Sequence, residues 1–582
     1  MNFELQYLHR IALLTSILGI VAFISDFGYS QSTEFQQLLD GFYFVALGIG
    51  VISTVARYFD RTNIFKRKVF VFDLLSVCFT LWTYYHYLFV GVPFRTDLLL
   101  ENSIWVKIAV VLSFIRELSA ARFNFKRTFL NPAQLFVASF FILIFLGAFL
   151  LQLPNATYTG ISFTNALFTS TSAVSVTGLS VVDTGTYFTE FGQIIIMSLI
   201  QLGGLGILTF SSYFAYFFKG GTSYENQLVL SDMTNSKKMG EVFSTLKNII
   251  LITFSIELLA SIFIFSSLKT RDFQSEYERI FFAVFHSVSA FCNAGFSTIS
   301  SGLYDDGFKH NYFLQLAVIF TFVLGGLGFP IVTNIINYLK YQAKKFLFSN
   351  RLKRDHRPWV LNLNSRITLI TTISITAVAF VAFYVLEYNN TLAEHHGFGK
   401  MVTALFGATT PRTAGFNSIN TAAMLFPTTM MVFLLMWIGA SPASTGGGIK
   451  TSTFAIATLN ILSLAKGKTR IEVFRREIAD ISVRRAFATI TLSLIVIGFG
   501  IMFISFFDNE KSLIDIAFEC FSAYSTVGLS LGITPYLSSA SKLILIIVMF
   551  VGRVSMLTLV IAVFKKIKHK NYRYPTEEMT IN

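Results

Sequence analysis

Charged side chains are scarce in this sequence. Only 13% of its 582 residues are Asp, Glu, Lys or Arg, about half the share in an ordinary soluble protein. Apolar runs long enough to cross about 30 Å of hydrocarbon recur along the chain, for example at 132–151, 248–267, 366–386 and 541–564. No soluble domain fits between them, so we expect a polytopic integral membrane protein.

Cysteine is also rare, and acidic and histidine clusters are missing from the apolar segments. The three cysteines, Cys78, Cys292 and Cys520, show no paired spacing, which argues against a disulfide framework. No group of His, Asp or Glu lies at a common depth in the predicted spans, as a membrane enzyme would need. A polytopic enzyme is therefore the least favoured functional class, and we expect no enzymatic activity.

The net charge of +14 comes from separated basic segments rather than from one continuous patch. Lysine and arginine fall mainly in six stretches, at 57–68, 116–127, 219–247, 340–366, 466–485 and 565–573. The alternate connections are poorer in both residues. The positive-inside rule then places the six stretches and both termini in the cytoplasm. Because the basic residues do not form one continuous patch, nucleic acid is disfavoured as the partner.

Four polar stretches, each with one glycine, interrupt the apolar pattern at nearly constant intervals. Their sequences are SAVSVTGLS (172–180), SAFCNAGFS (289–297), TTPRTAGFN (409–417) and AYSTVGLSL (523–531). Successive glycines are 117, 120 and 113 residues apart. A short aromatic-rich segment, too short to span a membrane, precedes each stretch. The pattern predicts four copies of one helix–loop–helix unit.

The predicted fold is an all-α integral membrane protein with four pseudo-symmetric helix–pore loop–helix repeats around a central pore. The repeats are placed at 129–220, 240–342, 360–465 and 480–570. The helices before the polar stretches are predicted at 132–152, 244–268, 364–388 and 484–507, and those after them at 191–218, 312–341, 426–462 and 541–565. An N-terminal extension, 1–128, adds about four transmembrane helices and brings the expected total to twelve.

Non-helical backbone at membrane depth leaves peptide groups unpaired unless protein, water or an ion satisfies them. Four such stretches on one axis would form a ring of carbonyl oxygens, which are suitable ligands for a dehydrated monovalent cation. Glycine permits the positive φ that turns successive carbonyls toward an axis. No ring of Asp or Glu occurs at these positions, which disfavours divalent ions. The alternative is that the glycines only permit close helix packing. We favour it less, because all four glycines occupy the same position in their repeats.

The stretches V-T-G-L-S, C-N-A-G-F-S, R-T-A-G-F-N and T-V-G-L-S resemble those of the Trk/Ktr/HKT superfamily of potassium transporters, specifically the bacterial membrane subunits. The resemblance covers roughly residues 130–570, and glycine at all four positions implies potassium permeation. The implied filter residues are Val176, Thr177, Gly178, Leu179, Cys292, Asn293, Ala294, Gly295, Phe296, Thr413, Ala414, Gly415, Phe416, Thr526, Val527, Gly528 and Leu529. Potassium is expected at Thr177, Gly178, Asn293, Gly295, Thr413, Gly415, Thr526 and Gly528.

The resemblance also implies an assembly and a location. It implies a homodimer in the bacterial inner membrane that binds a cytosolic nucleotide-binding regulatory subunit of the kind found in Trk and Ktr systems. The transported ion that the resemblance implies is potassium, and a role of sodium as an activating or coupling ion stays open.

The helix after the third polar stretch contains GASPASTGGGIKTST, from Gly439 to Thr453. Proline and three consecutive glycines disfavour a continuous helix, so we predict an unwound segment that acts as a gate below the filter. The residues assigned to the gate are Gly439, Ser441, Pro442, Ser444, Thr445, Gly446, Gly447, Gly448, Lys450 and Arg553. A phosphate-binding loop is disfavoured, because Ile449 separates the glycines from Lys450 and no strand precedes them.

Three single residues allow more than one interpretation. Arg553 is a charge at depth that either pairs with the gating segment or sets an electrostatic barrier to cations; snorkelling to the cytoplasmic interface is the alternative. His286 is expected to pack or form hydrogen bonds rather than relay protons. Arg412, at the entrance of the third filter stretch, could be structural or could tune ion entry.

The N-terminal extension has charges that loosely resemble a four-helix voltage sensor, including Arg57, Asp60, Arg61 and Asp73. Its fourth segment lacks arginine at every third position, so packing, dimerisation or partner docking is favoured. Gated potassium uptake is the preferred function, and a voltage- or ligand-gated monovalent cation channel is the alternative.

Overall fold

The computed structural model describes residues 2–59, 67–89, 99–120, 132–217, 242–270, 273–347, 361–555 and 559–560. The chain divides into two compact units. One comprises Met1–Thr128 with Leu153–Ala156, and the other comprises Phe129–Gln152 with Thr157–Asn582. The basic stretch 219–247 lies mostly outside the described residues, and 565–573 lies outside them entirely.

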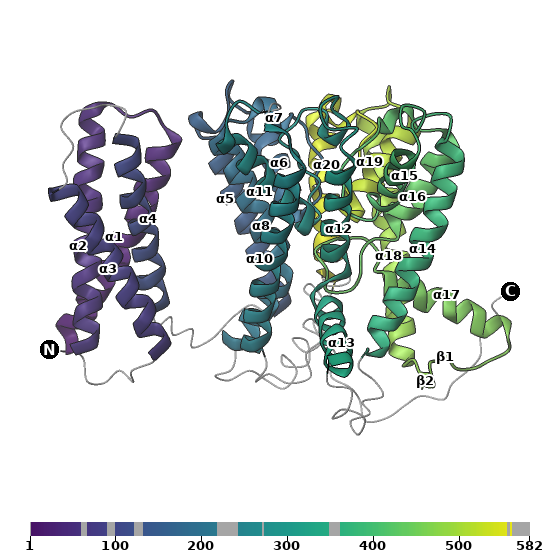
Figure 1. Ribbon diagram of the computed structural model, residues 1–582, viewed down its shortest axis with the longest axis horizontal. Coiled ribbons are helices and arrows are strands. Elements are labelled where there is room, and N and C mark those ends of the chain that lie inside the picture. The colour runs from purple at the N-terminus through teal and green to yellow at the C-terminus, as the bar shows by residue number, and fades with distance from the viewer. Residues whose placement is uncertain are drawn as a thin grey trace. The chain divides into compact units, whose positions relative to one another are not determined.

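The N-terminal unit is a four-helix bundle (Figure 1). Its helices are α1 (Asn2–Gly28), α2 (Thr33–Phe59), α3 (Arg67–Phe89) and α4 (Leu99–Ala120). Tyr43 and Leu47 of α2 pack against Val106 and Val110 of α4 in its apolar centre. The four N-terminal helices predicted from the sequence are therefore present.

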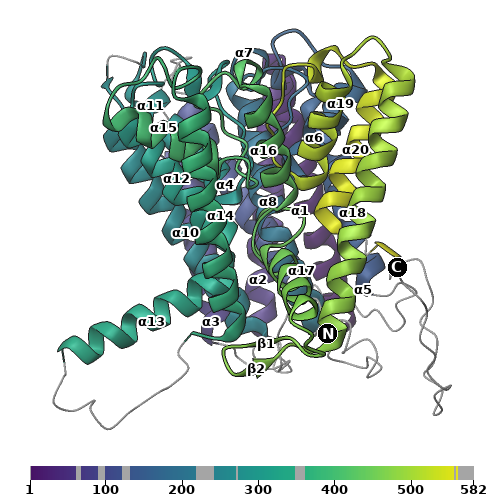
Figure 2. The ribbon, with the colours of Figure 1, turned by 90° about the vertical axis from the view of Figure 1, so that its right-hand side faces the viewer.

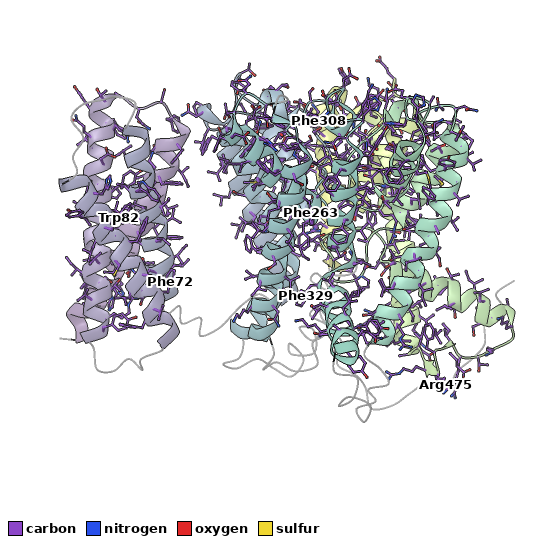
Figure 3. The ribbon with its side chains drawn as sticks, in the orientation of Figure 1. Phe72, Trp82, Phe263, Phe308, Phe329 and Arg475 are labelled. Atoms are coloured by element: carbon purple, nitrogen blue, oxygen red, sulfur yellow. The ribbon has the colours of Figure 1, made fainter. Side chains whose placement is uncertain are left out.

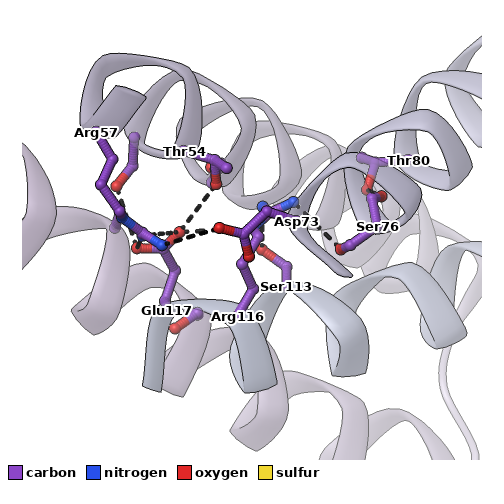
Figure 4. A network of polar contacts seen from close by, with 12 residues as sticks. Thr54, Arg57, Asp73, Ser76, Thr80, Ser113, Arg116 and Glu117 are labelled. Carbon is purple, nitrogen blue, oxygen red and sulfur yellow. Dashed lines mark hydrogen bonds and ion pairs between the residues drawn. The ribbon is translucent and has the colours of Figure 1, made fainter. Parts of the chain in front are cut away.

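A network of buried charges ties α2, α3 and α4 together (Figure 4). The Arg57 guanidinium donates to Glu117 at 3.0 Å and lies 3.8 Å from the Asp73 carboxylate. Arg116 is fully buried and donates to the Ser76 hydroxyl at 3.3 Å. Because a buried charge is tolerated only when it is paired and hydrogen-bonded, this network fixes how the three helices face one another.

The larger unit contains four successive groups of helices. The first has α5 (Pro132–Leu151), α6 (Phe163–Ser175), the single turn α7 (Thr184–Tyr187) and α8 (Glu190–Phe217); the second has α10 (Val242–Ser267), α11 (Glu276–Cys292), α12 (Tyr312–Leu327) and α13 (Phe329–Leu347). The third has α14 (Leu363–Glu387), α15 (Phe398–Thr409), α16 (Phe426–Trp437) and α17 (Thr451–Ala465); the fourth has α18 (Asp480–Phe507), α19 (Leu513–Ser525) and α20 (Ser539–Val554). Each group begins with a long helix followed by a short one, as the repeat pattern predicts.

The four groups pack in a closed ring. Helix α8 packs on α10 and α11, α12 on α15, α16 on α19, and α20 returns to α6. One hydrophobic cluster spans the contact between the second and third groups, and another includes Phe168 of α6 with residues of α18 to α20. The short helices α6, α11, α15 and α19 all lie toward the same end of the unit (Figure 2).

The outer surface of the helices is apolar, as a lipid-facing surface requires. Phe263 of α10, labelled in Figure 3, is half exposed. Among the described residues, five helical segments are long and apolar enough to cross a membrane, or six if the bent pair α12–α13 counts as one. This is fewer than the twelve expected, because several other apolar helices are shorter in the described part, and α16 and α17 are separate segments of one interrupted span.

Two helices that the sequence predicts to be continuous are interrupted in the structure. The helix predicted at 312–341 breaks at Gly328, which has a φ of +78°, and α12 and α13 meet at 106°. Pro330, at the second position of α13, is compatible with a helix start but not with a helix interior. The helix predicted at 541–565 is interrupted after Val554, where Ser555 has a φ of +72°, and residues 559–560 are again helical.

One short β-hairpin follows α17. Strands β1 (Glu472–Val473) and β2 (Arg476–Glu477) pair antiparallel across Phe474 and Arg475, which both have positive φ. That conformation is typical of a tight two-residue hairpin turn.

A candidate ion-conducting site

Three of the four short helices end in the same way. At the end of α6, Val176 adopts the left-handed conformation, its N–H donates to Ala173, and the Thr177 N–H donates to the Ser172 carbonyl at 2.8 Å. Helices α11 and α19 end on Asn293 and Thr526 with the same two hydrogen bonds. This pattern is a Schellman motif, although glycine is the usual residue at its left-handed position. A left-handed Val or Thr is strained, so the surrounding structure must hold the loop in place.

The third short helix ends differently. Helix α15 is followed by a further turn in which the Ala414 N–H donates to the Thr410 carbonyl at 2.9 Å. Thr413 then takes the positive φ, at +75°. Thr413 and Gly415 therefore have positive φ like the equivalent residues of the other three loops, although the hydrogen bonds that precede them differ.

The four glycines form a closed ring of backbone contacts. A Cβ added to Gly178 would overlap the carbonyl of Ala294, next to Gly295. A Cβ on Gly295 would lie 3.0 Å from the Ala414 oxygen, and one on Gly415 would overlap the Val527 carbonyl. A Cβ on Gly528 would overlap the Thr177 carbonyl, which returns to the first loop. At these glycines each loop thus packs against the main chain of the next one; a side chain would overlap that main chain at Gly178, Gly415 and Gly528 and would press on it at Gly295.

The backbone alternates in handedness along each loop. All four glycines have positive φ, and so do the residues two positions earlier, whereas the intervening residues do not. Structurally equivalent positions are therefore Val176, Asn293, Thr413 and Thr526. The potassium positions expected from the sequence include Asn293, Thr413 and Thr526, which are equivalent in backbone conformation to Val176; the expected position Thr177 is equivalent to Ala294, Ala414 and Val527.

The structure brings the seventeen predicted filter residues to the C-terminal ends of the four short helices. All are buried except Gly178, Gly295 and Gly528, which keep part of their surface exposed. Because α6, α11, α15 and α19 all end at this ring, the partial negative charges of their C-termini are directed toward it.

A set of hydroxyl groups behind the loops was missed by sequence reasoning. Ser172 and Ser522 accept hydrogen bonds from the N–H groups of Gly178 and Gly528, both at 3.1 Å. Ser289 and Thr410 instead donate to the carbonyls that follow the other two glycines, Phe296 at 2.8 Å and Phe416 at 2.6 Å. The signal was present in the sequence, since Ser-Ala stands six residues before the glycine in three of the four stretches.

Between α16 and α17 the chain is unwound from Ile438 to Lys450. An isolated β-bridge joins Ile438 to Ile449 and closes the base of this segment, which we call the gating loop (438–450). Its Ser441 N–H donates to the Gly326 carbonyl at 3.0 Å, next to the break between α12 and α13. All the predicted gating residues except Arg553, which is on α20, therefore lie in one non-helical segment.

Consecutive residues of the gating loop contact consecutive filter loops. The Thr445 hydroxyl lies 3.1 Å from the Asn293 side-chain amide. The Gly447 N–H donates to the Thr526 hydroxyl at 2.8 Å. Gly446, between them, leaves no room for a Cβ beside the Thr413 hydroxyl. The gating loop thus packs directly against the residues two positions before three of the filter glycines.

Two basic side chains hold the gating loop. Arg553 of α20 donates to the carbonyl of Thr445 and, at 2.7 Å, to that of Gly203 on α8. It is 4% exposed, which is not the arrangement of a snorkelling side chain. The Lys450 ammonium donates to the Gly446 carbonyl at 2.5 Å. Arg553 therefore connects the gating loop to helices of the first and fourth groups.

His286 on α11 has both ring nitrogens within hydrogen-bonding distance of partners. Nδ1 lies 2.9 Å from the Phe282 carbonyl, and Nε2 lies 2.9 Å from the Ser297 hydroxyl. The ring also stacks on Phe282. These contacts are those of a packed, hydrogen-bonded histidine.

Comparisons with known proteins give consistent relatives. Residues 102–574 match the TrkH family, described as a cation transport protein. The chain is 35% identical over 451 residues to the Ktr system potassium uptake protein B of Bacillus subtilis, covering 77% of this chain and 96% of that protein. It is 35% identical over 460 residues to the potassium/sodium uptake protein NtpJ of Enterococcus hirae, covering 78% and 97%. The crystal structure of the potassium transporter TrkH from Vibrio parahaemolyticus shares the fold, with a TM-score of 0.60 at 17% identity over 85% of this chain and 97% of that chain.

Proposed function

We propose, because the chain belongs to the TrkH family of cation transport proteins, that its ring of four glycine loops is a selectivity filter for potassium. The protein is a Trk/Ktr-type membrane subunit and a potassium uptake transporter rather than an enzyme. The observation that carries the filter assignment is the closed ring, in which each glycine packs on the backbone of the next loop.

The chemistry of the ring suits a monovalent cation. Carbonyl oxygens replace the water molecules around the ion, and the helix C-termini stabilise its charge without a fixed carboxylate. The Asp and Glu side chains that a divalent ion prefers are not among the seventeen filter residues. Selectivity in this proposal depends on the size and stiffness of the ring, which the strained left-handed residues and the hydroxyl groups behind them maintain.

The gating loop provides the second part of the proposal. In the arrangement described here it packs against the filter residues Asn293, Thr413 and Thr526, so it obstructs the path of an ion leaving the filter. Arg553 holds it there through the Thr445 carbonyl. Opening requires that this contact break and that residues 445–447 move aside.

The assembly completes the proposal. We place the protein in the bacterial inner membrane as a homodimer with both termini in the cytoplasm. A cytosolic nucleotide-binding subunit binds its basic loops and controls the gating loop. Sodium acts either as an activating ion or as a coupling ion. Measurement of potassium flux with and without sodium tests whether sodium has either role.

The experiment is potassium uptake in cells that lack their own potassium uptake systems. Deletion of residues 441–448 and Arg553→Ala should each raise potassium flux, because the first removes the obstruction and the second its attachment. Lys269→Ala, which removes a positive charge from an exposed side chain outside the six basic stretches, is the control and should leave flux unchanged. Unchanged flux in both gating variants, with normal amounts of folded protein, would refute the gate.

A further inference from the structure

A cavity of about 370 Å³ lies beside the gating loop, between the second and third groups of helices. Its walls come from α12, α14 and α15, and Ala440 and Ser441 of the gating loop close one side. This volume is within the range of small-molecule sites in proteins. The filter mechanism does not use it.

The cavity opens toward lipid. Ile373 on its α14 wall is 65% exposed on the outer surface of the unit, where the helices carry apolar side chains. The other lining residues include Phe322, Val323 and Phe380. A hydrocarbon chain that enters from the bilayer would therefore contact mainly apolar side chains.

Among the described residues that line this cavity, Arg412 is the single charged one. Its Nη1 donates to the Thr372 carbonyl at 3.4 Å and to the Thr376 hydroxyl at 3.3 Å, which are long hydrogen bonds. Its Nε has no partner, and no carboxylate among the described residues pairs with it. A guanidinium at membrane depth without a counter-charge is costly, so this site favours an anion.

We propose that the cavity binds an amphipathic carboxylate, such as a long-chain fatty acid, with its carboxylate on Arg412 and its chain against α12 and α14. The geometry provides both parts of the recognition: a guanidinium that offers further donors, and an apolar space that opens to the bilayer. A carboxylate suits the guanidinium because two parallel N–H donors match its two oxygens.

The occupant also acts on the gate, and this part rests on the proposed function. The cavity exists in the arrangement in which the Ser441 N–H bonds to the Gly326 carbonyl and the gating loop lies under the filter. A ligand that fits one arrangement better than the other shifts the population toward it. Bound carboxylate therefore keeps the gating loop in place and slows potassium flux.

The first experiment measures binding alone, on the full-length protein in detergent, by the shift of its thermal unfolding midpoint with oleate. Methyl oleate, which has the same chain without the charge, is the matched ligand control. We expect oleate to bind about tenfold more tightly than the ester, since a charge-assisted hydrogen bond distinguishes them. In Arg412→Gln the preference for oleate should disappear.

A second variant keeps the argument testable if Arg412→Gln does not fold. Ala377→Phe retains Arg412 but fills the α14 wall of the cavity, and it should weaken binding of both oleate and the ester. Equal binding of acid and ester to the unaltered protein, or unchanged oleate binding in both variants, would overturn the site.

The second experiment measures flux into proteoliposomes with oleate or methyl oleate. Oleate should slow potassium flux in the unaltered protein and have no effect after deletion of residues 443–448, which removes the obstruction but keeps Ala440 and Ser441 at the cavity. Equal slowing in this deletion variant would overturn the link to the gate. Absence of potassium flux in every variant would refute the proposed function instead, and the binding result would still stand.

Discussion

Replacement of Gly178 by alanine tests the ring at one of its four contacts. Gly178 has a φ of +92°, and its added Cβ would overlap the carbonyl of Ala294 in the neighbouring loop. The left-handed backbone alone costs an alanine about 1–2 kcal/mol. The overlapping atom is main chain rather than a flexible side chain, so the second loop must shift as well.

The expected effect is a loss of selectivity rather than of folding. A change of about 1.4 kcal/mol in the relative stability of bound potassium and bound sodium alters their ratio tenfold. Because the added Cβ forces the Ala294 carbonyl out of its place in the ring, the ring no longer fits potassium as well, and we expect the preference for potassium over sodium to fall at least about tenfold. The assay is competitive uptake of the two ions into proteoliposomes.

Gly498→Ala is the matched control. Gly498 lies inside α18, and a Cβ there meets nothing within 4 Å. Alanine in a helix interior is favoured over glycine by about 1 kcal/mol, so this variant should fold and keep its selectivity. A Gly178→Ala protein that transports and discriminates as the unaltered protein does would show that the ring does not set selectivity.

Three further variants test other parts of the structure. Ser522→Ala leaves the Gly528 N–H without its acceptor, at a cost of about 1–3 kcal/mol, and should lower the potassium-to-sodium uptake ratio, whereas Ser198→Ala should not. Glu117→Gln weakens a buried ion pair and should lower the thermal unfolding midpoint, since breaking such pairs costs about 3–5 kcal/mol; an unchanged midpoint would argue against the network. The Lys309 ammonium holds the pKa of the Glu394 carboxyl below its usual range. A depressed pKa contributes stability that is present at neutral pH and lost as pH falls through it, so Lys309→Ala should reduce the acid-induced fall in the midpoint, by a small amount because the pair is exposed.

The sequence predicted the repeat architecture because its signals are local and occur four times. The spacing of Gly178, Gly295, Gly415 and Gly528 marks one helix–loop–helix unit, and the structure contains four such groups in a ring. Pro442 and the glycines after it predicted the unwound segment by the same local logic. The segment LGGLGFP, which contains three glycines and Pro330, carries comparable signals for the break at Gly328, although no interruption was predicted there.

Relations between loops could not be predicted from one sequence, because they depend on tertiary packing. Nothing in the order of residues shows that Thr445, Gly446 and Gly447 meet the second, third and fourth loops in turn. The same holds for Arg412. It lies in the third filter stretch of the sequence, but in the fold its side chain lines the cavity formed by α12, α14 and α15. Similarly, the partners of Arg57 lie on two other helices, at distances in sequence that no local pattern reveals.

The four filter loops belong to a single chain, and this sets them apart from a pore made of identical subunits. A mutation in such a pore appears in every quadrant at once, whereas here it alters one quarter and leaves three intact. Each quarter can therefore acquire its own task, as the gating loop shows by engaging different partners on neighbouring loops. Stepwise replacement of the glycines, one quarter at a time, should consequently give intermediate degrees of ion discrimination that a symmetric pore cannot display.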